Sequence, residues 1–411
     1  MSTLRLFEAY GIEIEHMIVD RQSLDLRPVA DRLLEAEAGA RTADVERGDM
    51  AWSNELVLHV IEFKTNGPAP SLHGLARKFH AEALHAGELL APMGCRLMPT
   101  GAHPWMDPQT ETRLWPHECG VIYQAYDRVF SCKGHGWSNL QSMHINLPFA
   151  DDQEFARLHA AIRLLMPLMP ALTASTPVLD GRATGFLDTR MDYYARNSAR
   201  VPSVTGLVVP EQVASREEYD RIIMQPMFAD MAPLDPEGVL REEFLNARGS
   251  IARFGRGSIE IRVLDAQECP QADLAAAGLI CAALEALCDG RLGDLDAQAR
   301  LSTEALAAIW ARVTREADTA SVEDASYLKV LGFPGRPGVR ADEVWSWLAE
   351  TCLPTAMRDP DWEGPLAVML GQGCLARRIL EALGPDFGRG RLLEVYAELC
   401  DCLGGGRPFT T

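Results

Sequence analysis

Apolar and acidic residues alternate near the amino-terminal end of the chain, in residues 11–15. Ile12 and Ile14 occupy one set of alternate positions, and Glu13 and Glu15 occupy the other. A period of two is that of a half-buried β-strand, so the pattern predicts a strand with one apolar face and one acidic face. Two carboxylates on one face repel each other and need compensation, which either water or a divalent cation can supply. On this pattern alone, a solvated strand face is the simpler interpretation.

A second alternating strand is predicted at residues 258–265. Its apolar positions are Ile259, Ile261 and Val263, and the opposite positions are Glu260, Arg262 and Leu264. The Gly-Arg-Gly-Ser sequence of residues 255–258 predicts a four-residue turn that joins residues 251–254 to the second strand in a hairpin. The register of this hairpin sets Arg253 across from Glu260. Arg253, Glu260 and Arg262 would then form one charged cluster. Such a cluster is either a surface ion-pair ladder or a polyphosphate site, because guanidinium groups bind phosphate through paired hydrogen bonds.

Two further segments carry candidate ligands. Residues 52–66 form a β-rich run in which Glu55 and Glu62 are seven positions apart, on opposite faces of an unbroken strand. We therefore predict a bulge or a loop between them, which would let both acids face one side. Residues 141–149 predict a strand with His144 and Asn146 on one face. A lone histidine there is more often a hydrogen-bonded structural residue than a ligand.

Helical patterns flank and follow these strands. Apolar residues spaced three and four apart predict amphipathic helices at residues 272–288, 303–317, 341–351 and 391–403. Earlier helices are predicted at residues 71–91 and 152–172, the second broken by Pro167 and Pro170. The pattern therefore favours a sheet covered by helices, with a helical carboxy-terminal part.

Composition narrows the range of partners. The 411 residues include 58 acids against 39 bases, and the formal net charge of −19 argues against a nucleic-acid or anionic-membrane partner. The ten cysteines show no Cys-x-x-Cys pair and no dense spacing, so we expect them to be reduced. We find neither a signal peptide nor an apolar run near 18 residues, which predicts no membrane span and a cytoplasmic location.

In combination, these segments resemble glutamate-cysteine ligase family 2, the carboxylate–amine ligases, over roughly residues 8–275. The resemblance is carried by Gly11 to Glu15, by Glu55, Glu62, Thr65 and Asn66, by Gly101-Ala102-His103-Pro104, by His144-Ile145-Asn146, by residues 174–181 with Arg190, and by residues 258–265. It implies an α+β fold similar to that of glutamine synthetase, with a curved, largely antiparallel sheet backed by helices and the acids on its concave face. We expect a catalytic domain at residues 1–290 and a helical region at residues 291–411 packed on it.

The resemblance also implies a metal shell. It assigns Glu13, His144 and Glu260 to the cation nearest the phosphates, and Glu15, Glu55 and Glu62 to a second cation. Five carboxylates and one imidazole suit Mg²⁺ or Mn²⁺, because hard cations prefer oxygen ligands. ATP would be the co-substrate. Arg262 falls where the related fold stabilises the transferring phosphoryl group, Arg253 would contact the nucleotide phosphates, and both would act with Glu260 in catalysis.

The sequence departs from the family pattern in places that concern the substrates. Bacterial members usually carry His-x-His on the fourth segment, where this chain has Ser142 before His144. The Gly-Thr-His-Pro expected near residue 101 reads Gly-Ala-His-Pro. Our candidates for carboxylate recognition are Thr65, Asn66, Arg190 and Arg200, although an arginine in a loop is by default a solvated surface charge. The loops around the two arginines match loosely, which leaves the acceptor open.

The favoured hypothesis is ATP-dependent ligation of a carboxylate, the γ-carboxyl of glutamate, to an amine such as that of cysteine, through an acyl phosphate. One alternative keeps the fold and transfers a phosphoryl group to a guanidino or amine nitrogen. Another is a non-catalytic regulator that binds a nucleotide or an amino acid, which would have no evident need for so many buried acids. A small homo-oligomer is a further hypothesis, because glutamine synthetases form rings, but no pattern here marks an interface.

Overall fold

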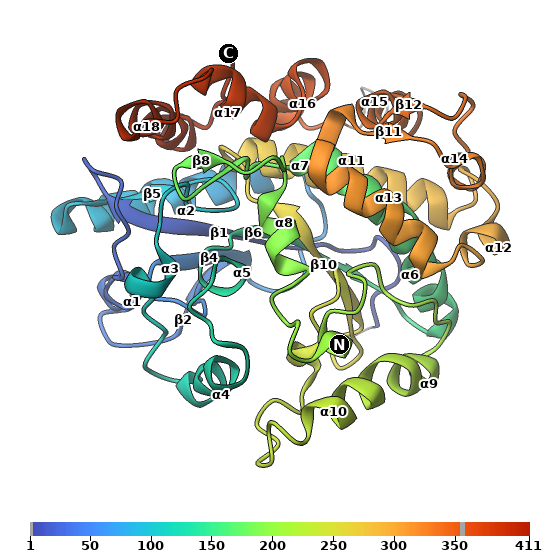
Figure 1. Cartoon of the computed structure of the whole chain (residues 1–411), viewed down its shortest axis with the longest axis horizontal. Coiled ribbons are helices and arrows are strands. Elements are labelled where there is room, and N and C mark those ends of the chain that lie inside the picture. The colour runs from blue at the N-terminus through green and yellow to red at the C-terminus, as the bar shows by residue number, and fades with distance from the viewer. Residues whose placement is uncertain (1–2, 354–357) are drawn as a thin grey trace.

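The computed structural model describes residues 3–353 and 358–411, and its centre is one large antiparallel sheet (Figure 1). The strands of this sheet are β1 (Gly11–Asp20), β2 (Asp44–Arg47), β3 (Met50–Asn54), β4 (Val60–Thr65), β5 (Cys95–Met98), β6 (Ser142–Pro148), β9 (Ser250–Arg253) and β10 (Ser258–Asp265). Their order is β2-β3-β4-β1-β6-β10-β9, with β5 also paired to β1. Two further two-stranded sheets pair β7 (Val178–Leu179) with β8 (Arg182–Ala183) and β11 (Ser321–Val322) with β12 (Val339–Arg340).

Helices surround the sheet and form a further layer at the carboxy-terminal end of the chain. They are α1 (Ala30–Ala38), α2 (Leu75–Leu90), α3 (Pro108–Glu111), α4 (Gly120–Phe130), α5 (His135–Ser138), α6 (Asp152–Leu165), α7 (Met169–Thr173), α8 (Thr189–Tyr194), α9 (Arg216–Tyr219), α10 (Gln225–Met231), α11 (Pro270–Cys288), α12 (Leu295–Gln298), α13 (Thr303–Glu316), α14 (Ala325–Leu331), α15 (Ala341–Cys352), α16 (Pro360–Gln372), α17 (Leu375–Leu383) and α18 (Arg389–Gly405). Short 3₁₀ turns lie at Ala91–Met93, Met166–Leu168, Pro202–Val204, Glu243–Leu245 and Ala317–Thr319, and a π-helical turn at Asp220–Met224. Figure 1 shows α15 to α18 above α2 and α11.

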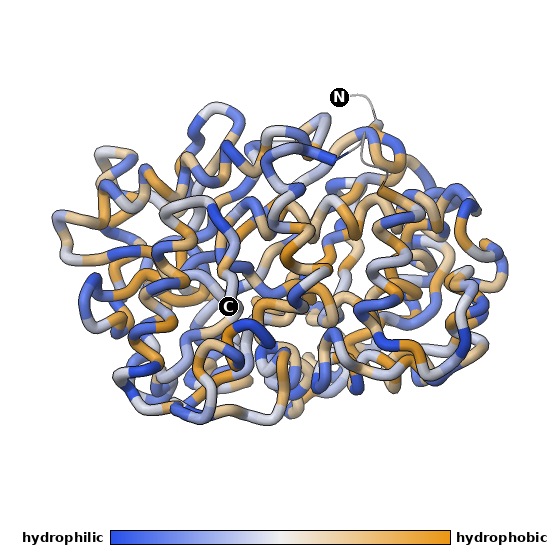
Figure 2. Tube along the Cα trace, turned by 90° about the horizontal axis from the view of Figure 1, so that it is seen from above, coloured by the Kyte–Doolittle hydropathy of each residue, from blue (hydrophilic) through white to orange (hydrophobic). Residues whose placement is uncertain are grey.

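Most of the predicted elements are present with small shifts at their ends. The predicted α+β fold is confirmed, and the long helix expected at residues 152–172 is broken at Pro167 and Pro170 into α6, a 3₁₀ turn and α7. The predicted break before Glu62 is also confirmed, because β3 ends at Asn54 and β4 begins at Val60. Figure 2 shows hydrophobic and hydrophilic stretches interspersed along the whole chain.

The hairpin between β9 and β10 corrects one prediction. Its loop is residues 254–257, so Arg253 pairs with Ser258, and Glu260 pairs with Ile251 instead of with Arg253. Gly257, at a φ of +64°, closes the turn one residue earlier than the sequence suggested. The predicted alternation of β10 also fails at its far end, because a register shift between Ile261 and Leu264 leaves Leu264 buried in the core.

The two faces of β1 bury different cores. Ile12, Ile14 and Ile18 pack into the main core with the helices behind the sheet. On the other face, Met17 and Val19 belong to a second core built largely from α17 and α18. Glu13 and Glu15 precede them on that face. The acidic face of this strand therefore continues directly into an apolar stretch that the carboxy-terminal helices cover.

Helix α11 is the central helix of the molecule and contacts α2, α6, α15 and α16. At Gly278 a side-chain carbon would lie 2.9 Å from Cζ2 of Trp362, so the close approach of α11 and α16 requires glycine. Contrary to our sequence-based expectation, α11 and the stretch Asp152–Thr173 are long and apolar enough to cross a membrane. Their apolar windows are 94% and 89% buried inside the protein, which accounts for their composition.

Because several of its histidines are buried, we expect the protein to lose stability in mild acid. Burial lowers the pKa of His159 to about 3, and neither ring nitrogen bonds to a described residue. Burial also lowers the pKa of His103 to about 3. Because these folded-state values lie below the ordinary value near 6.5, their contribution is intact above that pH and is lost as the pH falls toward 3. Each histidine should cost about 1.4 kcal/mol of unfolding free energy per pH unit in that window.

Urea unfolding at pH 7, 6 and 5 measures this slope. His159→Leu should reduce it, whereas His73→Gln, at a side chain that is 58% exposed, serves as the control. An unchanged slope in His159→Leu would contradict the assignment.

Candidate active site

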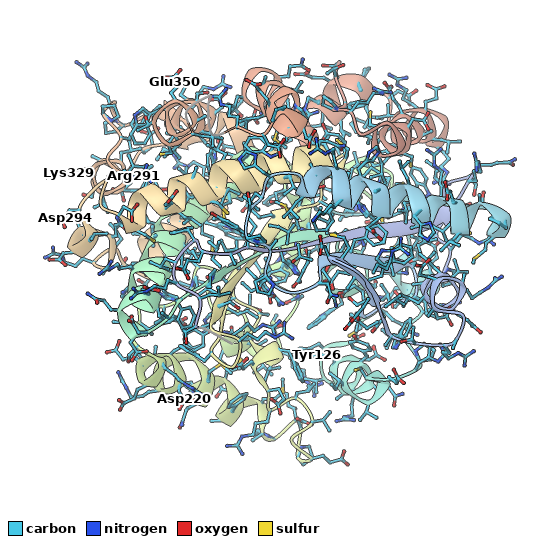
Figure 3. All side chains as sticks on the ribbon, turned by 180° about the vertical axis from the view of Figure 1, so that it is seen from behind. Tyr126, Asp220, Arg291, Asp294, Lys329 and Glu350 are labelled. Atoms are coloured by element: carbon cyan, nitrogen blue, oxygen red, sulfur yellow. The ribbon has the colours of Figure 1, made fainter. Side chains whose placement is uncertain are left out.

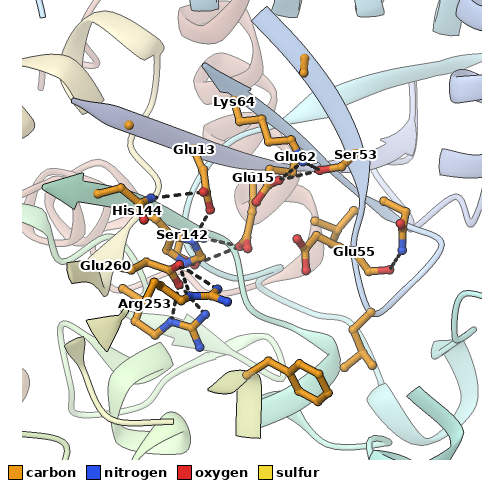
Figure 4. A pocket seen from close by; sticks show the side chains of 18 of the residues that line it. Glu13, Glu15, Ser53, Glu55, Glu62, Lys64, Ser142, His144, Arg253 and Glu260 are labelled. Carbon is orange, nitrogen blue, oxygen red and sulfur yellow. Dashed lines mark hydrogen bonds and ion pairs between the residues drawn. The ribbon is translucent and has the colours of Figure 1, made fainter. Parts of the chain in front are cut away.

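A cavity of about 960 Å³ opens over the acidic face of the sheet. Strand pairing explains why acids from distant parts of the chain meet there. Glu13 pairs with His144 across β1 and β6, and Glu15 pairs with Glu62 across β1 and β4. Directly opposed side chains of neighbouring strands lie about 5 Å apart, so the register alone brings these four together. Figure 4 shows them with Glu260 in one cluster.

Glu55 joins this cluster from the loop between β3 and β4. The amide of Asn54 donates hydrogen bonds to the carbonyl oxygen of Glu55 and to the hydroxyl of Tyr123, both at 3.1 Å, and so ties the loop to α4. In this arrangement Glu55 turns back toward Glu15 and Glu62, which an unbroken strand would not allow.

Within the described residues, two groups of ligand atoms lie close enough to hold a cation. One group is Glu15, Glu55 and Glu62, and the other is Glu13, Glu62 and His144, with the ligand atoms of each group all within 4.8 Å of one another. The first group is the set expected for the second cation. The other group has Glu62 in the place where Glu260 was expected. Glu62 is thus common to both groups.

Glu260 is engaged by two arginines. Arg253 donates to its Oε2 from Nε and Nη2, at 3.1 and 2.8 Å, and Arg262 donates to its Oε1 from Nε and Nη2, at 3.0 and 2.6 Å. Burial raises the pKa of Glu260, but Arg262 and Arg253 outweigh it and hold the pKa well below its ordinary value. The predicted charged cluster therefore exists, although Arg253 reaches Glu260 diagonally across the hairpin.

His144 and Ser142 link the acids of β1. Nδ1 of His144 lies 3.0 Å from Oε2 of Glu13, and Nε2 lies 2.9 Å from Oγ of Ser142. Ser142 in turn donates to Oε2 of Glu15 from its backbone nitrogen at 2.6 Å and from its hydroxyl at 3.0 Å. Burial lowers the pKa of His144, but the hydrogen bond with Glu13 and the nearby acids raise it above its ordinary value.

The remaining acids are poorly compensated. Burial and the neighbouring Glu15 and Glu62 raise the pKa of Glu55 well above its ordinary value. Burial and the charge of Glu13 raise the pKa of Glu62 to about 8. Lys64 lies 3.4 Å from Glu62, and Ser53 donates a hydrogen bond to Glu62 at 2.5 Å. These contacts leave an excess of carboxylate oxygens in a confined space, which fits divalent cations of the Mg²⁺ type.

Several lining residues were not predicted from the sequence. Lys64 follows Glu62 by two positions on β4 and faces the same side, a spacing that could have revealed it. Arg256 lines the cavity from the β9–β10 turn. Ser53 and Ser142 act by bonding the acids. No pattern marks Ser53, whereas Ser142 stands at the first position of the His-x-His motif, which could have revealed its role.

The four candidates for carboxylate recognition lie in different surroundings. Thr65 and Asn66 line the cavity, but Thr65 accepts a hydrogen bond from the Ile12 backbone, and Asn66 is exposed. Arg190 also lines the cavity and is buried. Arg200 is not among the described lining residues; its guanidinium is exposed and donates to the Val129 carbonyl at 2.7 Å. The structure therefore brings three of the four together.

Asp265 holds Arg190 in place. It bonds Nε of Arg190 and accepts hydrogen bonds from the Ser175 backbone nitrogen at 2.8 Å and from the Thr176 hydroxyl at 3.0 Å. A side-chain carbon on Gly101 would lie 2.6 Å from Cγ of Asp265, so only glycine fits there. The Gly-Ala-His-Pro segment thus supports the cavity from behind.

A model of glutamate-cysteine ligase family 2 matches residues 9–329. The chain belongs to this family. The match covers most of the chain, including all the strands that form the floor of the cavity. It extends beyond residue 290, so the predicted division at that residue stays a prediction.

Relatives of this family member include proteins of archaea and bacteria. An uncharacterized protein from Archaeoglobus fulgidus is 33% identical over 330 residues, which are 78% of this chain and 88% of that one. A protein from Rubrobacter xylanophilus, provisionally named glutamate–cysteine ligase 2-3, is 27% identical over 66% of this chain and 67% of its own length.

Two solved structures share the fold at 12% sequence identity. The bifunctional glutathione synthetase from Pasteurella multocida aligns with a TM-score of 0.61, covering 96% of this chain. This chain spans about half of that protein, 53% of its length. The glutamate–cysteine ligase from Francisella tularensis, in complex with AMP, aligns with a TM-score of 0.56 over 98% of this chain and 90% of its own. These similarities confirm the architecture of the family member described here.

Metal binding should stabilise the protein through Glu62. Adding Mg²⁺ or Mn²⁺ at about one hundred times its Kd should stabilise the folded state by about 2.7 kcal/mol, because the ion binds the converged acids only when they are folded. Glu62→Gln replaces the carboxylate shared by both groups with a neutral amide and should abolish most of this gain, measured as the rise in Tm on adding metal. Glu88→Gln, at a side chain that is 80% exposed, is the control. An equal metal-dependent rise in both variants would contradict the site.

Proposed function

We propose that the protein uses ATP to join the γ-carboxyl of glutamate to an amine, through an acyl phosphate. The observation that carries this proposal is the convergence of two acid groups on the shared Glu62, directly beside an arginine pair held by Glu260. A cation site next to guanidinium groups is the arrangement that phosphoryl transfer from ATP requires. Family membership supports the same reaction class.

In this proposal the carboxylates and His144 hold divalent cations, which neutralise charge on the phosphate oxygens of ATP. Arg262 lies at the acids and stabilises the charge that develops on the transferring phosphoryl group. Arg253 and Arg256 contact the nucleotide phosphates from the β9–β10 hairpin. Glu260 keeps the guanidinium groups of Arg253 and Arg262 oriented, since one of its carboxylate oxygens is bonded to each of them. Positioning and electrostatics therefore provide most of the catalysis.

Arg190 is our candidate for the carboxylate of the donor substrate. Its Nε is bonded to Asp265, and its Nη2 has no hydrogen-bond partner among the described residues. A buried guanidinium with one unsatisfied nitrogen is suited to a carboxylate ligand. Thr65 and Asn66, which also line the cavity, are candidates for further substrate contacts.

Replacing Glu260 tests the arginine arrangement. Glu260→Gln should lower kcat by about 100-fold or more, because a neutral amide cannot hold two guanidinium groups in the same geometry. Steady-state ADP release measures the loss, and circular dichroism verifies the fold. Glu211→Gln provides a matched control, since Glu211 bonds Arg248 through both oxygens but does not line the cavity. Unimpaired ADP release by Glu260→Gln would contradict the assigned role.

The overall reaction is tested by ADP release with ATP, Mg²⁺ and glutamate against a panel of amines. Mass spectrometry should find a product equal to glutamate plus the amine minus water. A phosphorylated amine or guanidine would instead support phosphoryl transfer to nitrogen. Release of ADP only when glutamate is replaced by another carboxylate would overturn the choice of donor.

A further inference from the structure

One end of the cavity is lined by aromatic rings. We define the aromatic wall as Tyr123 and Tyr126 on α4, Trp137 on α5, and Phe244 in the 3₁₀ turn Glu243–Leu245. The rings pack against one another: the centroid of Tyr126 lies 5.3 Å from that of Trp137 and 6.3 Å from that of Phe244. Outside the cavity lining, Phe130 stacks on Trp137 at 5.3 Å. The wall is therefore a preformed surface.

The polar groups of the wall are already bonded to the protein. The Tyr123 hydroxyl accepts from the Asn54 amide at 3.1 Å, and the Tyr126 hydroxyl donates to the Phe244 carbonyl at 2.9 Å. The Trp137 indole nitrogen donates to the Asn197 carbonyl at 3.1 Å. Apart from the O–H of Tyr123, for which no acceptor is found among the described residues, these residues offer a ligand ring surface. Leu56 and Leu140 extend the apolar lining beside them.

The strand register places the wall away from Arg253 and Arg256, whereas Arg262 on β10 lies nearer and its charge acts on Tyr126. Arg253 pairs with Ser258, which pairs with Pro148 at the end of β6, and Arg256 lies in the adjoining turn. Trp137, by contrast, lies before the first residue of β6, Ser142. The acid groups of β1 and β4 lie between the two ends. In Figure 3, Tyr126 on α4 lies on the opposite side of the sheet from α2 and α11. A nucleotide with phosphates on Arg253 and Arg256 leaves the wall to another substrate.

The lysine and arginine side chains that line the cavity all have other roles, so none is left to bind a second carboxylate at the wall. Among the described lining residues these side chains are Lys64, Arg190, Arg253, Arg256 and Arg262. In the proposed function Arg262 serves the transferring phosphoryl group, and Arg253 and Arg256 serve the nucleotide phosphates. Lys64 is bonded to Asp44 and Glu62. Arg190 is taken by the donor carboxylate in the proposed function. An acceptor with its own carboxylate would lack a free partner here, at a cost of several kcal/mol for a buried unpaired charge.

We propose that the acceptor is an apolar primary amine without a carboxylate, whose aryl or alkyl group packs on the aromatic wall. This inference rests on the proposed function and specifies its second substrate. The amine nitrogen attacks the acyl carbon of the acyl phosphate, the new C–N bond replaces the C–O bond to phosphate, and the nitrogen loses one proton to the medium. Inorganic phosphate leaves, so the step needs no further reactant.

The first test uses the full-length wild-type protein with ATP, Mg²⁺ and glutamate. Three amines are compared at equal concentration: 2-phenylethylamine, methylamine and cysteine. We expect kcat/KM for 2-phenylethylamine to exceed that for methylamine and for cysteine by about tenfold or more, because the ring buries apolar area that the other two lack. The amide of glutamate and 2-phenylethylamine should appear by mass.

The second test removes parts of the wall. Phe244→Ala should raise the KM for 2-phenylethylamine by about tenfold, with the KM values for ATP and glutamate unchanged. The Phe244 substitution leaves its backbone carbonyl, and hence the Tyr126 hydrogen bond, in place. Val121→Ala is the matched control, because Val121 lies on the same helix as Tyr123 with 68% of its side chain exposed. Tm values verify that the variants fold.

Each outcome decides between distinct alternatives. Preference for cysteine would overturn the apolar acceptor and leave the ligase proposal intact. A raised KM for ATP in Phe244→Ala, with that of the amine unchanged, would assign the wall to the adenine base and also overturn the apolar acceptor. Absence of ADP release with every amine and every carboxylate tested would overturn the ligase proposal and the acceptor with it.

Discussion

The site depends on keeping like charges together in a buried place. Five carboxylates from β1, the β3–β4 loop, β4 and β10 converge on one cavity, and neighbouring carboxylates repel one another. The protein reduces this cost locally: two guanidinium groups hold Glu260, Ser142 and His144 bond the acids of β1, and Lys64 approaches Glu62. The raised pKa of Glu55 and the value of about 8 for Glu62 show where compensation is incomplete. That is where a divalent cation would contribute most.

Part of this arrangement could be predicted from the sequence, because the alternation of side chains along a strand can be read from it. Glu13 and Glu15 alternate with isoleucines, and such a pattern fixes which way each side chain points once the strand forms. The break before Glu62 was predictable for the same reason, since two acids seven positions apart cannot share a face of an unbroken strand. The family resemblance then placed His144 and the acids in one site.

Other features depend on contacts that a local pattern does not contain. The register of the β9–β10 hairpin depends on where Gly257 closes the turn. The turn predicted from the sequence was one residue too late, and it therefore set Arg253 opposite Glu260 instead of Ser258. Glu260 pairs with arginines in the place where we expected a cation ligand, a competition that depends on distances between side chains. The aromatic wall joins residues from three elements, and none of them has a spacing that distinguishes a cavity lining from ordinary core.

Strand β1 serves the cavity and two cores at once, which restricts how this protein can change over evolutionary time. Inserting or deleting a single residue within Gly11–Asp20 would exchange its faces, turning Ile12 and Ile14 toward the cavity and Glu13 toward the main core. The same slip would withdraw Met17 and Val19 from beneath α17 and α18. A change in the length of this strand should therefore be tolerated far less well than a change in the length of a surface loop.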